Sequence, residues 1–217
     1  MPKLFLPFTP QGERTELAAI RIKRHLGLPP DAAVDPFAVL PDVPARLIDV
    51  SLLDPALLAD HVDGWSGIGF GWLPSGEELI GLNPTHTETR QRATLMEEIV
   101  HIVLDHPKTT LTVSSGAVTV RPFTSSAPDA LPSRGDTRAT ARASARTFTT
   151  SVEDDAYNIG AACVVPYRPL FDAVHMRHEH ATTIAERFRV SPELITYRIK
   201  RAGLSNVYRK HHPSGAR

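Results

Sequence analysis

The chain of 217 residues has a single cysteine, Cys163, which lies within an apolar run. One cysteine excludes an intrachain disulfide and is typical of a protein kept in a reducing cytoplasm. No apolar run approaches the roughly 20 residues that a membrane-spanning helix needs. The stretch Leu4–Phe8 is interrupted by Pro7 and is too short for the core of a signal peptide. We therefore expect a soluble, cytoplasmic protein with no membrane partner.

The chain also lacks net charge, because 24 Lys and Arg balance 24 Asp and Glu. Residues 166–217 hold ten basic and four acidic side chains, a formal charge of +6, which leaves 14 basic and 20 acidic, or −6, for residues 1–165. An acidic body with a basic tail indicates either an anionic partner or a contact between the two halves. No internal repeat is visible, and the length suits one core with a small appendage.

Capping residues, prolines and hydrophobic periodicity divide the chain into elements. The predicted helices are 13–26, 35–40, 56–61, a central helix through 94–106 that Thr87 or Thr89 caps, 153–165, one near 170–174, and a helical pair in 183–199. The predicted strands are 45–53 and two hairpins, 67–73 with 78–83 and 110–113 with 117–120. Residues 1–12 are expected to form a flexible arm, and 121–147, which hold few large apolar residues, a flexible loop.

The central helix carries the candidate chemistry. Glu97 and His101 are four residues apart, so both project from one face, and Glu98 lies about 100° round the axis. This is the layout of the H-E-x-x-H helix, in which two ligands one turn apart bind zinc and a glutamate takes a proton from water. Glu97 replaces the first histidine, and a carboxylate can bind Zn²⁺ at about 2.0–2.2 Å. On this helix alone, a solvated face is the competing interpretation.

These segments together resemble the ImmA/IrrE family of metallo-endopeptidases. The resemblance runs from about residue 14 to residue 208, and its sharpest parts are Ile80–Pro84, Arg90–His106 and Glu153–Pro166. It implies an α+β fold: a zincin-like domain with a small antiparallel or mixed sheet and an active-site helix, plus a C-terminal helical hairpin. The implied divisions are the arm 1–12, a peptidase domain 13–170 with the insertion 121–147, and a helical region 171–217.

The resemblance also implies the site residues. The family's third metal ligand is a Glu that begins an Ala-rich apolar helix, and the matching residue here is Glu153. Glu97, His101 and Glu153 would then hold Zn²⁺, and Glu98 would be the general base. Family members carry His where this chain has Glu97. Because a second carboxylate donates more charge to the metal, slow hydrolysis, another metal such as Mn²⁺, and a metal-free protein all stay open.

The family resemblance further implies a protein substrate, specifically a DNA-binding repressor. One alternative is a catalytically degenerate protein that binds a repressor without cutting it. Another is a DNA-binding regulator, because the helical pair in 183–199 and its basic surroundings are typical of a helix-turn-helix. Against the DNA-binding alternative, Arg189 occupies the turn position at which Gly is usual.

The remaining candidates have simpler interpretations. His106 is expected about 140° round the central helix from His101 and so away from a ligand position. His86 is a possible replacement ligand, although nothing in the sequence requires it. We expect His175, His178 and His180 in a solvated linker and His211 and His212 in a frayed tail. Trp65 and Trp72 are expected in the core or at the rim of the sheet, and Cys163 is expected to be a small buried residue.

Overall fold

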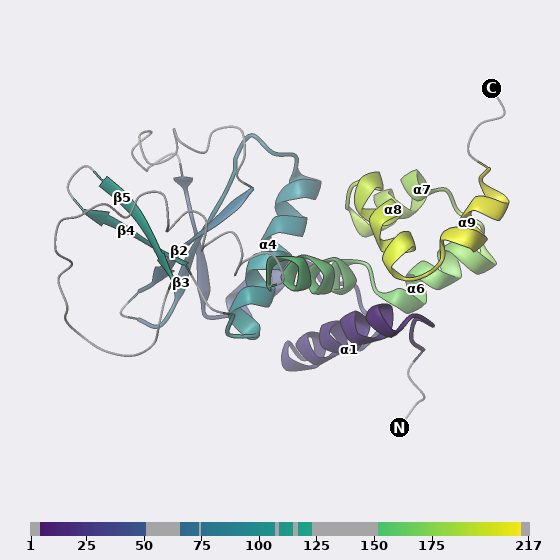
Figure 1. The fold of residues 1–217 in the computed structure, drawn as a ribbon, viewed down its shortest axis with the longest axis horizontal. Helices are drawn as coiled ribbons and strands as arrows, with labels where there is room; N and C mark the ends of the chain where they lie inside the picture. The colour runs from purple at the N-terminus through teal and green to yellow at the C-terminus, as the bar shows by residue number, and fades with distance from the viewer. Residues whose placement is uncertain are drawn as a thin grey trace.

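The computed structural model describes residues 5–50, 66–73, 75–106, 109–114, 117–122 and 152–213. Figure 1 shows the strands at one end of the molecule, helix α4 (Glu88–Val103) in the middle, and the C-terminal helices at the other end. The helix predicted at 56–61 and residues 123–147 of the predicted loop lie outside the described residues. Across the ranges described, no helix has both the length and the apolar character that crossing a bilayer requires.

Three strands form a small mixed sheet. They are β1 (Ala45–Ile48), β2 (Gly67–Trp72) and β3 (Glu78–Leu82), in the order β1–β3–β2. β2 and β3 pair antiparallel as the predicted hairpin, whereas β1 runs parallel to β3, with Ala45 opposite Glu78. The alternative of an entirely antiparallel sheet is therefore wrong. The combination of helices with a small sheet is compatible with an α+β zincin-like fold.

A second antiparallel hairpin follows the central helix, as the sequence predicts. Its strands are β4 (Thr109–Ser114) and β5 (Ala117–Pro122), with Leu111 opposite Val120. β5 includes residues 121 and 122, which were predicted to begin the flexible loop. β5 therefore extends two residues beyond the predicted end of this strand.

The N-terminal helix α1 spans Pro10–His25 and begins three residues before the predicted start. The Thr9 hydroxyl accepts a hydrogen bond from the Gly12 amide at 3.1 Å, and Pro10 occupies the first helical position. Residues 10–12 are therefore helical, although they were predicted to belong to the arm. The short helix α2 (Pro36–Val39) follows the cap Asp35 as predicted, and the 3₁₀ turn η1 (Leu40–Asp42) continues it.

Two helices cross closely in the middle of the molecule. α4 is capped by Thr87, and residues 152–164 form the second helix. A Cβ added at Gly160 would lie 3.3 Å from the backbone nitrogen of Glu97, so the contact admits no larger side chain without movement. The close packing predicted from the small residues 160–162 is thus confirmed.

The C-terminal part is entirely helical where it is described. Its elements are α6 (Tyr167–Phe171), the π-helical turn η3 (Asp172–Met176), α7 (Ala181–Phe188), α8 (Pro192–Arg201) and α9 (Ser205–His211). Arg189 adopts the left-handed conformation with φ 53° between α7 and α8, and Ser191 caps α8. The predicted helical pair is present. The interpretation of His211 as part of a frayed tail is wrong, because that residue ends α9.

Ion pairs connect the basic C-terminal helices to the acidic N-terminal half. Arg198 on α8 contacts Glu16 on α1 at 2.9 Å, and both side chains are almost fully buried. Arg189 reaches Glu88 at the start of α4 and lies 3.9 Å from Asp35. Of the two explanations for the charge asymmetry, these contacts favour the one in which the halves bind each other.

Candidate metal centre

Helix α4 presents Glu97 and His101 from one face, one turn apart, with Glu98 beside them. The rotation of the helix is fixed by the apolar side chains on its other faces, of which Leu95, Met96, Ile99 and Val100 are fully buried. Each such side chain contributes roughly 1.5–3 kcal/mol when it leaves water. Burial on those faces leaves the two glutamates and the histidine on the partly buried face.

Glu153 reaches the same place from the first turn of the 152–164 helix. Its Oε2 atom lies 3.4 Å from Nε2 of His101. Glu97, His101 and Glu153 each offer one ligand atom within 4.8 Å of the others. Two ligands that both sit about 2.1 Å from a tetrahedral Zn²⁺ would be about 3.4 Å apart. The spacing therefore suits a shared cation.

The electrostatics of this group also fit a divalent cation. Burial, followed by the charges of Glu98 and Glu153, raises the pKa of Glu97 to about 7. Burial likewise raises the pKa of Glu98 to about 6, although His101 opposes the shift. Burial would lower the pKa of His101, but its hydrogen bond with Glu153 and the surrounding carboxylates outweigh that effect and raise it. Three carboxylates around one imidazole leave an excess of negative charge that a divalent ion would neutralise.

His106 lies beside His101, which the sequence did not lead us to expect. α4 ends at Val103, Asp105 adopts φ 50°, and the His106 amide donates to the His101 carbonyl at 2.9 Å. This turn brings the Nδ1 atoms of the two histidines to 3.3 Å. Burial and then the charge of His101 lower the pKa of His106, so a neutral His106 can accept a hydrogen bond from His101 Nδ1. Nε2 of His101 is then directed toward Glu153.

Glycines of β2 form the wall next to Glu98. A Cβ at Gly67 would lie 3.0 Å from Oε1 of Glu98 and 2.6 Å from the Thr94 methyl group. A Cβ at Gly69 would lie 2.7 Å from Oε1 of Glu78 and 3.9 Å from Oε2 of Glu98. Side chains at either position would press on these carboxylates. The alternating glycines at 67 and 69 are the sequence signal for this close approach, and our sequence interpretation did not use it.

The other predicted candidates do not join this group. Within the described parts of the chain, Glu97, His101 and Glu153 are the one set of three potential ligands that converges, and His86 is outside it. Cys163 is fully buried as predicted, and burial raises the pKa of its thiol to about 12. Trp65 lies outside the described residues.

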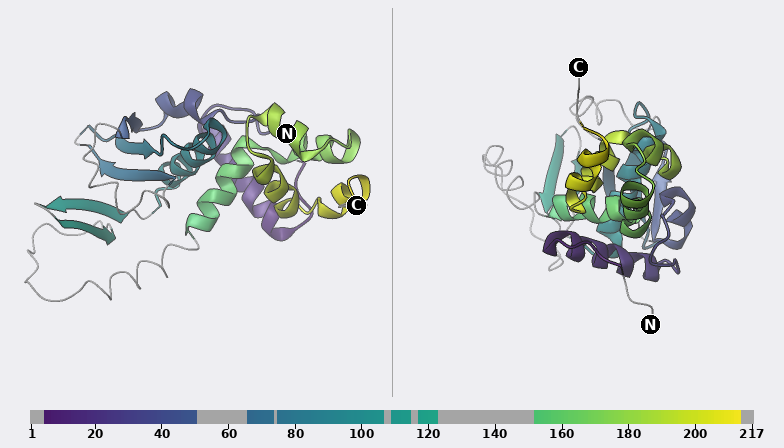
Figure 2. Two further views of the ribbon diagram at one scale, coloured as in Figure 1. Left: turned by 90° about the horizontal axis from the view of Figure 1, so that it is seen from above. Right: turned by 90° about the vertical axis from the view of Figure 1, so that its right-hand side faces the viewer.

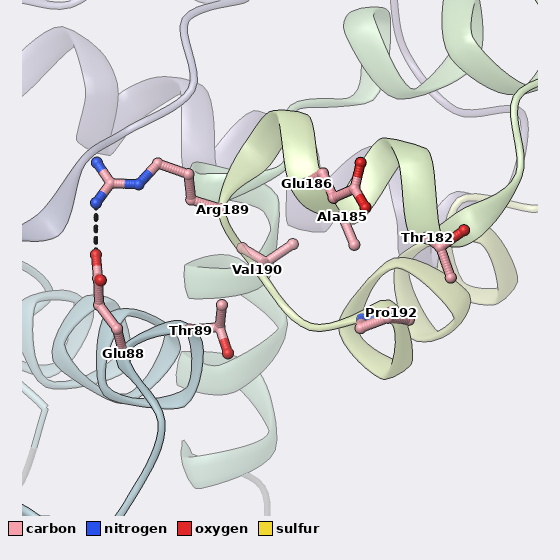
Figure 3. Close-up of a pocket in the computed structure, with 8 residues that line it drawn as sticks. All are labelled: Glu88, Thr89, Thr182, Ala185, Glu186, Arg189, Val190 and Pro192. Carbon is pink, nitrogen blue, oxygen red and sulfur yellow. Dashed lines mark hydrogen bonds and ion pairs between the residues drawn. The ribbon is translucent and has the colours of Figure 1, made fainter.

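A separate open pocket of about 450 Å³ lies between the start of α4 and the turn from α7 to α8. Figure 3 shows Glu88 and Thr89 on one side of it and Ala185, Val190 and Pro192 on the other. The ion pair between Arg189 and Glu88 joins the two sides. Since this pocket holds none of the four candidate site residues, it is distinct from the metal centre.

The fold and this arrangement of side chains are compatible with the zincin-like class of metallopeptidases. Residues 131–200 match the family model Peptidase_M78, described as the IrrE N-terminal-like domain, and this match supports the resemblance to the ImmA/IrrE family. No curated protein and no solved structure matches the chain. The matched range covers less than half of the chain, begins inside the predicted insertion and includes Glu153 but not α4. It supports a metallopeptidase-like function with a protein substrate in general.

Proposed function

We propose that this protein is a metal-dependent endopeptidase that binds its metal through Glu97, His101 and Glu153 and uses Glu98 as general base. The observation that carries the proposal is the approach of the three ligand atoms to within 4.8 Å from two separate helices. When bound, a divalent cation supplies Lewis acidity, which polarises a peptide carbonyl and makes water more acidic.

The side chains of the chain itself perform the proton transfers. With a pKa of about 6, Glu98 is mostly ionised at pH 7 and can take a proton from the attacking water. The resulting carboxylic acid then donates that proton to the amine that leaves. Gly67 and Gly69 bring the backbone of β2 close to this carboxylate, where a larger side chain would press on it. His106 orients the His101 ring.

Glu97 sets the expected metal and rate. Two carboxylates and one imidazole donate more negative charge than the family's usual set with a second histidine in place of Glu97, so we expect slow hydrolysis. Zn²⁺ is the expected metal, and the oxygen-rich set makes Mn²⁺ the second choice. The substrate class that we propose, a DNA-binding repressor, is supported by family resemblance. The proposed location in the cytoplasm is supported by the single cysteine, which is buried and free.

Metal content tests the proposal directly. Purified protein should carry about one equivalent of metal, and Glu153→Gln should lose it. The matched control is Asp154→Asn, which removes a carboxylate from the next, exposed residue of the same helix and should keep the metal. Wild-type protein without metal, or equal metal in both variants, would overturn the proposal.

Two other functions are kept as alternatives. A protein that binds a repressor without cutting it is favoured by one observation, Glu97 in place of the family's histidine. Such a protein would bind the repressor without a stoichiometric metal and would leave the repressor intact in a cleavage assay. Cleavage of the repressor by wild type would therefore exclude this alternative.

The DNA-binding alternative is opposed by the charges of the helical pair. Within the described C-terminal residues, Arg177 and Arg187 bind Glu179, Arg198 binds Glu16, and Arg189 binds Glu88. These cations are therefore engaged inside the chain. A mobility-shift assay decides: DNA binding that weakens steeply with added salt would favour the alternative.

A further inference from the structure

A tyrosine borders the candidate metal centre and has no part in the proton transfers described above. Glu153, Tyr157 and Gly160 follow one another at spacings of four and three along one helix, so they form a single stripe on its surface. Glu153 contacts His101 at one end of this stripe. At the other end, Gly160 packs so closely on α4 that an added Cβ would lie 3.3 Å from the Glu97 nitrogen. Tyr157 therefore lies on the face toward α4, between these two contacts.

The C-terminal helices hold Tyr157 in this position. Its ring meets the ring of Tyr197 on α8 edge to face, with the centroids 5.2 Å apart. The Tyr197 hydroxyl donates a hydrogen bond to Oδ1 of Asn158, which also accepts one from Nε of Arg201 at 2.8 Å. Figures 1 and 2 show the helix of Glu153, coloured green, between α4 and the C-terminal helices. The ring of Tyr157 is therefore fixed from the side opposite the candidate metal centre.

The hydroxyl group of Tyr157 is available to a ligand. Within the described ranges of the chain it has no hydrogen-bond partner, whereas the Tyr197 hydroxyl is engaged by Asn158. Unlike the Tyr167 hydroxyl, it is not fully buried, so a ligand can reach it. Burial, followed by the neighbouring Tyr197 and Glu97, raises the pKa of Tyr157, so the phenol keeps its proton at neutral pH. Tyr157 thus offers a free hydrogen-bond donor beside the centre.

We propose that Tyr157 is a further catalytic residue, whose hydroxyl donates a hydrogen bond to the oxyanion of the peptide that is being hydrolysed. This inference rests on the proposed endopeptidase function. As the water oxygen bonds to the carbonyl carbon, a water proton passes to Glu98 and the π electron pair moves onto the carbonyl oxygen. That oxyanion accepts the hydrogen bond from Tyr157, which keeps its proton. The carbonyl re-forms as the C–N bond breaks, and the amine takes the proton from Glu98.

The position of the donor explains why it would accelerate the reaction. A hydrogen bond to a full negative charge is stronger than one to a neutral carbonyl, so the donor stabilises the transition state more than the bound substrate. Because packing against Tyr197 already fixes the ring, little reorganisation is needed when the charge develops.

Calorimetric titration of the zinc-loaded full chain with two inhibitors tests the role of Tyr157. A phosphonamidate dipeptide carries a tetrahedral anionic group that resembles the oxyanion, whereas a mercaptoacyl dipeptide with the same side chains binds metal through sulfur and lacks that group. Tyr157→Phe keeps the ring but removes the donor, so affinity for the phosphonamidate should fall by about 10–100-fold. Affinity for the mercaptoacyl dipeptide and the metal content should not change.

Tyr208→Phe is the matched control, because it removes a phenol hydroxyl on α9 that accepts a hydrogen bond from the Ala181 amide. It should bind both inhibitors as wild type does. Equal affinity of wild type and Tyr157→Phe for the phosphonamidate would overturn the role of Tyr157 and leave the proposed endopeptidase in place. An equal loss for both inhibitors would also overturn it, because the phenol would then only shape the pocket. Wild type that holds no metal would instead overturn the proposed function, and this inference with it.

Discussion

Two regions of the molecule differ in how their charges are balanced. At the candidate metal centre, Glu97, Glu98 and Glu153 surround His101, and burial raises the pKa values of Glu97 and Glu98 to about 7 and about 6. In the C-terminal helices, arginines are held by carboxylates, and the pair of Arg198 with Glu16 is almost completely buried.

This difference in charge balance distinguishes charges that stabilise the fold from charges that are available to bind a ligand. A paired, buried ion such as Arg198 has its partner inside the chain, so it contributes to docking the helices and leaves little for another molecule. A cluster of like charges costs free energy in the folded protein, and either protonation or a bound cation relieves that cost. The acidic centre is therefore the better candidate for function, and the basic helices for internal contact.

The largest expected effect is on catalysis, and it tests the acidic region at the candidate metal centre. Glu98→Gln keeps the shape of the side chain but cannot accept a proton, so proteolysis should fall by about 10²–10⁴-fold. Metal content should not change, because Glu98 is not among the converging ligands. The control Glu186→Gln, at an exposed position of α7, should cut as wild type does. Activity of Glu98→Gln near that of the control would refute the role of Glu98.

The second largest effect is expected on stability, and it tests the basic C-terminal helices. Arg198→Met leaves Glu16 charged and buried without its partner, so the free energy of unfolding should fall by about 3–5 kcal/mol. Arg46→Met is the control, because the pair of Arg46 with Glu77 is exposed and its loss should change the free energy of unfolding very little. Urea denaturation followed by circular dichroism measures both. Similar losses of unfolding free energy in the two variants would show that the buried pair stabilises the fold no more than the exposed pair does.

A smaller effect is expected from the support of a ligand. His106→Phe keeps a ring of similar size but cannot accept a hydrogen bond from Nδ1 of His101, which lies 3.3 Å away in wild type. Metal affinity should fall by about 10–100-fold. Calorimetry against wild type measures the change, and His175→Phe, at an exposed position outside the candidate metal centre, should leave the metal affinity unchanged. Unaltered affinity in His106→Phe would show that His106 merely packs there.

The sequence predicted the part of the site that depends on one helix. A spacing of four places Glu97 and His101 on one face whatever the rest of the fold, and family resemblance supplied Glu153. His106 was missed because its position depends on where α4 ends, and Asp105 turns the chain back before the helical angle assumed for residue 106 applies. An extrapolated helix could not reveal that contact.

Long-range pairing escaped prediction for a related reason. Local alternation indicates a strand at β1, but its parallel register with β3 depends on how the segment between them folds. α9 was missed because no side chain caps its start, and none of its residues is fully buried. The stacking of His178 on His211 could not be predicted without α9, because over 30 residues separate them in the sequence.

The smallest effect is a pH dependence of metal affinity, which follows from the raised pKa of Glu97 and tests whether its carboxylate binds the cation. In the metal-free protein, Glu97 with a pKa of about 7 is largely protonated at pH 6 and largely ionised at pH 8. A metal binds the ionised form, so below pH 7 it must displace this proton, and affinity should fall by about tenfold per pH unit. The raised pKa of His101 acts in the same direction.

Above pH 7, the contribution of Glu97 to this dependence should level off. Calorimetry in buffers of different ionisation enthalpy would count the protons released. Binding that is equally tight at pH 8 and pH 6, with no proton released, would mean that Glu97 is not a ligand. The contrast between the two regions would then lack support at the candidate metal centre.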